Sequence, residues 1–149
     1  MVKVFQSLAR EGLIEHTICS ARDYRPLDEH HDHGWIPRFK EDGGQVVIGG
    51  DLKMKENTLE RLALAQAGMI SFYFAGRWCQ AKLFVKSAML LNWWPCIESQ
   101  MKEASSGECW EIPYQWSWTE LRDVSPRPDL GIQPLRPKGS KPKLAISNE

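Results

Sequence analysis

The stretch Gln45–Asp51, which reads QVVIGGD, decides the fold of this chain. The continuous β-branched run Val46–Ile48 is typical of a strand that is covered on both faces in a parallel sheet. Two glycines, Gly49 and Gly50, then allow the backbone to turn sharply or to approach a ligand closely. Asp51 is therefore expected just beyond the C-terminal end of a strand, where open α/β sheets bind ligands. The alternative is that Asp51 only begins the next loop or caps the next helix.

Before this stretch the sequence predicts a helix, a strand and a second helix. Apolar residues recur at helical spacing over residues 2–9. The β-branched residues of Leu13–Cys19 favour a strand. Asp32 is placed to cap a helix whose inward face includes Trp35 and Ile36.

After the stretch, a helix is predicted from about Asn57, with Leu59 and Leu62 at helical intervals. The dense apolar run Met69–Phe74 has the length of a strand and predicts a further parallel strand. Each crossover helix obliges its flanking strands to run the same way, so the order of elements predicts an α/β fold with a mainly parallel sheet.

The last elements are an amphipathic helix and a late strand. The helix is predicted over residues 80–94, and Pro95 either kinks it or begins a second helix up to Ala104. The run Cys109–Pro113 predicts a strand whose proline suggests the edge of the sheet.

Composition indicates one domain and no general attraction to polyanions. The chain has 149 residues, and its 19 basic residues balance its 19 acidic ones. We expect one domain over residues 1–121, followed by a disordered tail rich in proline and lysine over residues 122–149. No apolar run is long enough to span a bilayer and no signal peptide is recognisable, so a cytoplasmic protein without membrane contact is expected.

Acidic residues gather after two of the predicted strands. Asp28, Glu29 and Asp32 follow the first predicted strand, and parallel strands bring them to the same sheet edge as Asp51. Hard cations such as Mg²⁺ take carboxylate oxygens as ligands, so these acids form a candidate metal site. The alternative is a set of solvated surface acids. The histidines within Asp28–His33 also suit zinc, although adjacent residues of one loop seldom enclose a tetrahedral ion.

Basic and aromatic residues follow the C-terminal ends of the strands. Lys53, Lys55 and Arg77 are candidate contacts to the phosphates of a nucleic acid, and the alternative is ordinary surface charge. Trp78 is a candidate for stacking on bases.

Several short motifs, in this order, make the chain resemble PIN-like domains of the VapC toxin type. They are an Asp-x-x-Trp-Ile helix start, Gly-Asp after a strand, Trp-Trp-Pro before an acidic helix, and a late Trp-Glu-Ile-Pro strand followed by tryptophan. Here they lie at Asp32–Ile36, Gly50–Asp51, Trp93–Glu98 and Trp110–Pro113. The resemblance covers about residues 4–118.

The resemblance implies a three-layer, Rossmann-like PIN fold and an endoribonuclease dependent on Mg²⁺ or Mn²⁺. It implies that Asp32 and Asp51 hold the metal and act in catalysis. It also implies an RNA substrate, a homodimer, and a toxin that is paired with an antitoxin protein.

One departure from the family affects the expected activity. The family opens with a strand that carries an Asp-Glu-Asn-like motif, and its Asp is a primary metal ligand. This sequence begins inside the helix that follows that strand, so the resemblance implies that the strand and its carboxylate are missing, through a late start codon or a truncation. We therefore expect weak or no nuclease activity and poor solubility from the chain as it stands.

Two other classes of function stay open. One is a non-catalytic protein-binding module of the same fold, in which the acids hold no metal. The other is a nucleotide-binding enzyme that uses Gly49 and Gly50 for phosphate. The second needs a helix directly after the glycines, whereas the helix signal begins only at about Asn57.

Overall fold

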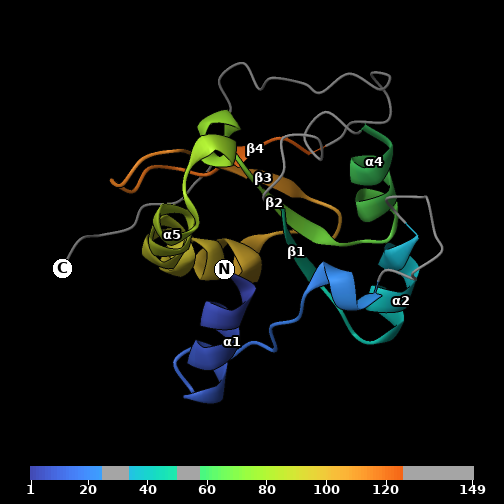
Figure 1. The fold of residues 1–149 in the computed structure, drawn as a ribbon. Helices are drawn as coiled ribbons and strands as arrows, with labels where there is room; N and C mark the ends of the chain where they lie inside the picture. Colours follow the sequence, from blue (N-terminus) through green and yellow to red (C-terminus); the bar gives the residue numbers. More distant parts are fainter. Residues whose placement is uncertain (25–33, 50–57, 126–149) are drawn as a thin grey trace.

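A computed structural model describes residues 1–24, 34–49 and 58–125, and it has a four-stranded sheet between two layers of helices (Figure 1). The strands lie in the order β1 (Val46–Gly49), β2 (Ile70–Phe74), β3 (Cys109–Ile112) and β4 (Arg122–Asp123). The first three are parallel, and β4 runs antiparallel to β3. The predicted three-layer α/β fold with a mainly parallel sheet is therefore confirmed.

The helices lie on both faces of the sheet. They are α1 (Val2–Arg10), α2 (Trp35–Glu41), α4 (Thr58–Gln66) and α5 (Leu83–Glu103), with short 3-10 helices η1 (Ala21–Tyr24) and η2 (Gly76–Gln80). Helices α1 and α5 cover one face, and α2 and α4 cover the other (Figure 1).

Alternating side chains of the strands divide the core into two clusters. Phe72 and Phe74 of β2 point toward α1 and α5, whereas Tyr73 points toward α2 and α4. In β1, Val47 joins the α2 and α4 cluster, and Val46 and Ile48 pack against the other. The strand predicted from QVVIGGD is thus present and is covered on both faces.

The strand predicted over Leu13–Cys19 is wrong, because this segment has no regular secondary structure. Its apolar side chains pack without a sheet: Ile14 is buried, and Ile18 lies against the core cluster of α1 and α5. The side chain of Gln6 donates a hydrogen bond to the main-chain oxygen of Ile18 (3.2 Å), which occupies an acceptor that a neighbouring strand would otherwise use.

Two predictions about helix ends are resolved by the structure. Helix α5 is one continuous helix that contains Pro95, so the alternative of a second helix is wrong. The N-cap of α2 is Gly34, so this helix begins later than a cap at Asp32 would place it. Asp32 itself lies outside the described residues.

The predictions about the late strand and the tail need correction. Strand β3 pairs with β2 on one side and with β4 on the other, so within the described sheet it is not an edge strand. Pro113 follows the last residue of β3, where its missing N–H removes no ladder hydrogen bond. Leu121 is buried and β4 begins at Arg122, so the ordered domain continues past the boundary expected at residue 121.

None of the helices in the described part of the chain has the length and apolar character needed to cross a membrane.

Candidate functional site

The C-terminal ends of the three parallel strands define one edge of the sheet, called here the C-terminal edge. Gly49, Phe74 and Ile112 are the last residues of β1, β2 and β3. Because the strands are parallel, the segments that follow these three residues all start at this edge.

Most of the predicted site residues lie outside the described residues. They are Asp28, Glu29, Asp32, Asp51, Lys53 and Lys55. The structure does show what bounds residues 50–57, which include Asp51, Lys53 and Lys55. Strand β1 ends with Gly49 at the C-terminal edge, and α4 begins with Thr58. The convergence of the four acids stays a prediction, and it has lost one of its grounds, because residues 13–19 form no strand that would bring Asp28, Glu29 and Asp32 to this edge.

Arg77 lies where the sequence predicted it. It follows β2 directly, within η2, and its side chain is exposed at the C-terminal edge. An exposed guanidinium at this place is free to pair with a phosphate. Its contact to RNA stays a prediction.

Trp78 does not have the role expected from the sequence. Its side chain is fully buried (0% exposed). Its ring stacks on that of Phe74, with the ring centroids 4.4 Å apart, and its Nε1 donates a hydrogen bond to the main-chain oxygen of Ile112 (3.1 Å). A nucleic-acid base has no access to this ring, so the prediction of base stacking is wrong. Trp78 instead ties the residues after β2 to the end of β3.

A row of residues, one from each strand, crosses the sheet beside this edge. The strand register places Gly49, Tyr73, Glu111 and Arg122 next to one another on successive strands. The Nη1 atom of Arg122 lies 3.2 Å from Oε1 of Glu111, and the Glu111 side chain is only 8% exposed. This places a buried carboxylate beside the edge where Asp51 is expected.

Helix α4 adds two buried charges to this row. Glu60 and Arg61 are only 2% and 5% exposed, whereas Leu59, which the helical pattern singled out, is 62% exposed. The guanidinium of Arg61 donates to the main-chain oxygen of Val124 and lies 5.8 Å from the centre of the Tyr73 ring. The first turn of α4 is thus anchored to the sheet by polar groups.

These residues are called the edge cluster below: Glu60, Arg61, Tyr73, Glu111 and Arg122. Two carboxylates and two guanidinium groups balance each other, so the cluster carries no net charge. Burial raises the pKa of the Tyr73 hydroxyl, because it disfavours the charged phenolate. Tyr73 therefore stays protonated at neutral pH and remains a hydrogen-bond donor.

The edge cluster is suited to positioning rather than to metal binding. Its acids are compensated by arginines, and no group of three or more His, Cys, Asp or Glu side chains that could hold a metal ion occurs in residues 1–24, 34–49 and 58–125. The contacts of Arg61 hold the first turn of α4, which follows residues 50–57, against β2 and the residue after β4.

The sequence contained a signal for these missed residues. Glu111 is a charged residue within the otherwise apolar run CWEI, and Glu60 and Arg61 occupy the buried face of a helix. A charged residue at a position that the strand or helix buries is uncommon unless it is paired. Helical phase alone could not show which face of α4 is buried, because both faces carry leucine or alanine.

The described residues define a class of protein: a three-layer α/β domain with a mainly parallel sheet. A family model described as a PIN like domain matches residues 1–76 of the 149-residue chain, a range that includes α1 to β2 and both Asp32 and Asp51. The chain belongs to the PIN-like domain family. Neither the curated proteins nor the solved structures include a match.

Proposed function

We propose that this PIN-like domain is an endoribonuclease that depends on Mg²⁺ or Mn²⁺. One observation carries the proposal: β1, β2 and β3 are parallel, and β1 ends with Gly49 two residues before Asp51. A strand that ends in this way delivers the next residues to the edge where α/β sheets bind ligands. Membership of a family with a nuclease-type fold supports the same proposal.

Each proposed site residue has a chemical role. The carboxylates of Asp51 and Asp32 hold the cation, and Asp28 and Glu29 are further oxygen donors. The bound cation supplies a water molecule of lowered pKa and stabilises negative charge on the phosphodiester. Lys53, Lys55 and the exposed Arg77 pair with phosphates and hold the RNA against the edge.

The biological setting is proposed from the resemblance to VapC-type domains. In this proposal the chain is a cytoplasmic toxin that acts as a homodimer, and a separate antitoxin protein blocks it. The edge cluster supports the site from within, because Arg61 holds the first turn of α4, which follows residues 50–57, against the sheet.

Binding of Mn²⁺ tests the proposed metal site directly. Free Mn²⁺ gives a sharp electron paramagnetic resonance signal that is lost on binding, so a titration of the 149-residue chain measures affinity without any RNA. We expect Asp51→Asn to weaken binding at least about tenfold, because it replaces an anionic ligand by a neutral one. Glu11→Gln is the matched control, since Glu11 is exposed at the end of α1 and no predicted site residue lies on this helix.

Equal Mn²⁺ affinity for the wild type and Asp51→Asn would contradict the assignment of Asp51. If neither protein bound Mn²⁺ while both stayed folded, the non-catalytic protein-binding module would replace the nuclease as the function of this domain.

A further inference from the structure

Three large aromatic side chains are exposed in the loop that joins β3 to β4. They belong to Tyr114, Trp116 and Trp118, whose exposed fractions are 36%, 56% and 40%. The loop leaves β3 at the C-terminal edge and is the orange segment that extends to the left above α5 in Figure 1. Residues 114–118 are called the aromatic loop below. Single exposed apolar side chains are ordinary, but a group of them marks a binding surface.

Hydrogen bonds to α5 hold the aromatic loop in place. The Nδ2 atom of Asn92 donates to the main-chain oxygen of Trp116 (2.7 Å), and the main-chain oxygen of Asn92 accepts from Nε1 of Trp118 (2.7 Å). The Nε1 atom of Trp93 donates to the main-chain oxygen of Gln115 (2.8 Å). Rings that are fixed before binding lose little conformational entropy when a ligand stacks on them.

Polar residues separate the exposed rings. Gln115 and Ser117 lie between them in the sequence, and residues 114–119 include no charged side chain that would repel a polyanion. The core of a protein interface is a continuous apolar surface. Separate aromatic faces instead suit nucleic-acid bases, because every base has a flat face that can stack.

The aromatic loop lies beside an exposed cation of the C-terminal edge. The rings of Tyr114 and Trp78 meet edge to face, with their centroids 5.7 Å apart, and Arg77 directly precedes Trp78 in η2. Aromatic rings next to a basic group that contacts the backbone are the usual means by which proteins bind single-stranded nucleic acids.

The order of the strands sets the order of these groups along the edge. Asp51 follows β1, Arg77 follows β2, and the aromatic loop follows β3. Neighbouring strands lie about 4.8 Å apart, so the ends of β1 and β3 are about 10 Å apart. Stacked nucleotides advance about 3.4 Å each, so a few nucleotides of one strand cover this distance.

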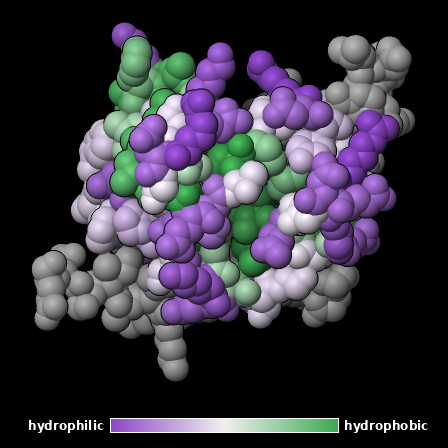
Figure 2. Space-filling model, turned by 90° about the horizontal axis from the view of Figure 1, so that it is seen from below, coloured by the Kyte–Doolittle hydropathy of each residue, from purple (hydrophilic) through white to green (hydrophobic). Residues whose placement is uncertain are grey.

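The aromatic loop is separate from the other apolar surface of the molecule. Figure 2 shows that surface in green at the centre of the face seen from below, with hydrophilic residues around it. It is a hollow between β1 and residues 15–19, and no residue of the aromatic loop is among its described lining residues. The hollow therefore has no part in the binding surface at the C-terminal edge.

We propose that the aromatic loop stacks on the bases of a single-stranded RNA whose phosphates pair with Arg77. This inference rests on the proposed endoribonuclease function and adds how the substrate is held, with Trp116 and Trp118 each contacting a base. The bases of double-stranded RNA stay stacked on one another and offer no faces to these rings. The aromatic loop therefore selects unpaired RNA.

Binding of a fluorescein-labelled RNA dodecamer of alternating cytidine and adenosine tests the proposal. Fluorescence anisotropy in EDTA and about 0.1 M KCl measures its affinity without cleavage. We expect Trp116→Ala to weaken binding at least about fivefold, as is typical of one lost stacking contact. Trp116→Phe keeps an aromatic face and is expected to retain most of the affinity. The dodecamer annealed to its complement is expected to bind Trp116→Ala and the wild type equally.

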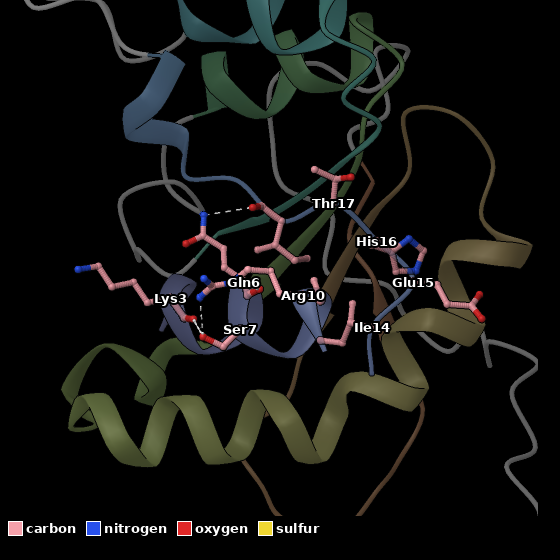
Figure 3. A pocket seen from close by; sticks show the side chains of 10 residues that line it. Lys3, Gln6, Ser7, Arg10, Ile14, Glu15, His16 and Thr17 are labelled. Atoms are coloured by element: carbon pink, nitrogen blue, oxygen red, sulfur yellow. Dashed lines mark hydrogen bonds between the residues drawn. The ribbon is translucent and has the colours of Figure 1, made fainter. Parts of the chain in front are cut away.

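Arg77→Ala tests the phosphate contact. We expect it to weaken binding of the dodecamer and to reduce the salt dependence of the affinity, because one phosphate contact is lost. Arg10→Ala is the matched control, since Figure 3 shows Arg10 on α1 beside Ser7, where its Nη2 donates to Oγ of Ser7 (3.1 Å). An equal loss of affinity for the two variants would contradict the role of Arg77.

Three outcomes would overturn the stacking. The first is no binding of the dodecamer by the wild type. The second is equal affinity of the wild type and Trp116→Ala, or an equal loss with the duplex. The third is a dimer that Trp116→Ala converts to a monomer in sedimentation velocity, because a second copy would then cover the aromatic loop. Binding that depends on Trp116 without any Mn²⁺-dependent cleavage would support the stacking and contradict the catalytic proposal instead.

Discussion

Trp78→Ala is expected to lower the free energy of unfolding by about 3–5 kcal/mol, as truncation of a buried tryptophan does. The indole is fully buried, stacks on Phe74, and donates a hydrogen bond to the main-chain oxygen of Ile112. The substitution removes apolar contacts, leaves a cavity and deprives a buried carbonyl of its donor. Urea unfolding followed by circular dichroism measures the change.

Trp116→Ala is the matched control for this prediction. The Trp116 side chain is 56% exposed, so its loss is expected to cost less than about 1 kcal/mol. If Trp78→Ala were as stable as the wild type but bound RNA more weakly, the assignment of Trp78 to the core would be wrong. The prediction that Trp78 stacks on bases would then hold.

Arg61→Met is expected to lower the free energy of unfolding by about 3 kcal/mol, because it removes a buried positive charge from among buried carboxylates. The guanidinium is 5% exposed, donates to the main-chain oxygen of Val124, and shares the edge cluster with Glu60 and Glu111. Methionine fills most of the same volume, so the loss reports charge and hydrogen bonding rather than a cavity. Urea unfolding measures this change as well.

The control for Arg61 is Arg22→Ala, which removes an exposed arginine of η1 and is expected to change stability by less than about 0.5 kcal/mol. A loss of less than about 1 kcal/mol for Arg61→Met would mean that the edge cluster does not anchor α4 to the sheet. The proposed support of residues 50–57 by this cluster would then fail.

The sequence predicted the parallel sheet because its strands are short apolar runs that end in glycine or proline. Val46–Ile48 and Met69–Phe74 have the β-branched or aromatic composition of buried strands, and the helical pattern between them obliges them to be parallel. The same reasoning failed for Leu13–Cys19, since composition alone does not reveal whether a neighbouring strand is available. That segment packs its isoleucines against helices instead.

The assembled edge cluster could not be predicted, because the sequence hints only at Glu111 and local patterns do not show which positions of α4 become buried. Glu111 and Tyr73 are far apart in the chain, and only the register of β2 and β3 brings them together. The burial of Glu60 depends on the sheet beneath α4, which the local sequence of the helix does not show. The position of Arg77 was predictable, because it directly follows a strand whose end the sequence marks with Ala75 and Gly76.

Cleavage of single-stranded RNA by the wild type and by Asp51→Asn, with Mn²⁺ and with the metal removed by EDTA, tests the central claim most directly. We expect a slow Mn²⁺-dependent rate for the wild type that EDTA abolishes. We expect a rate at least about 100-fold lower for Asp51→Asn, because a lost metal ligand removes the stabilisation of the transition state. Equal measurable rates for the two proteins, or cleavage that survives EDTA, would contradict the proposed nuclease site.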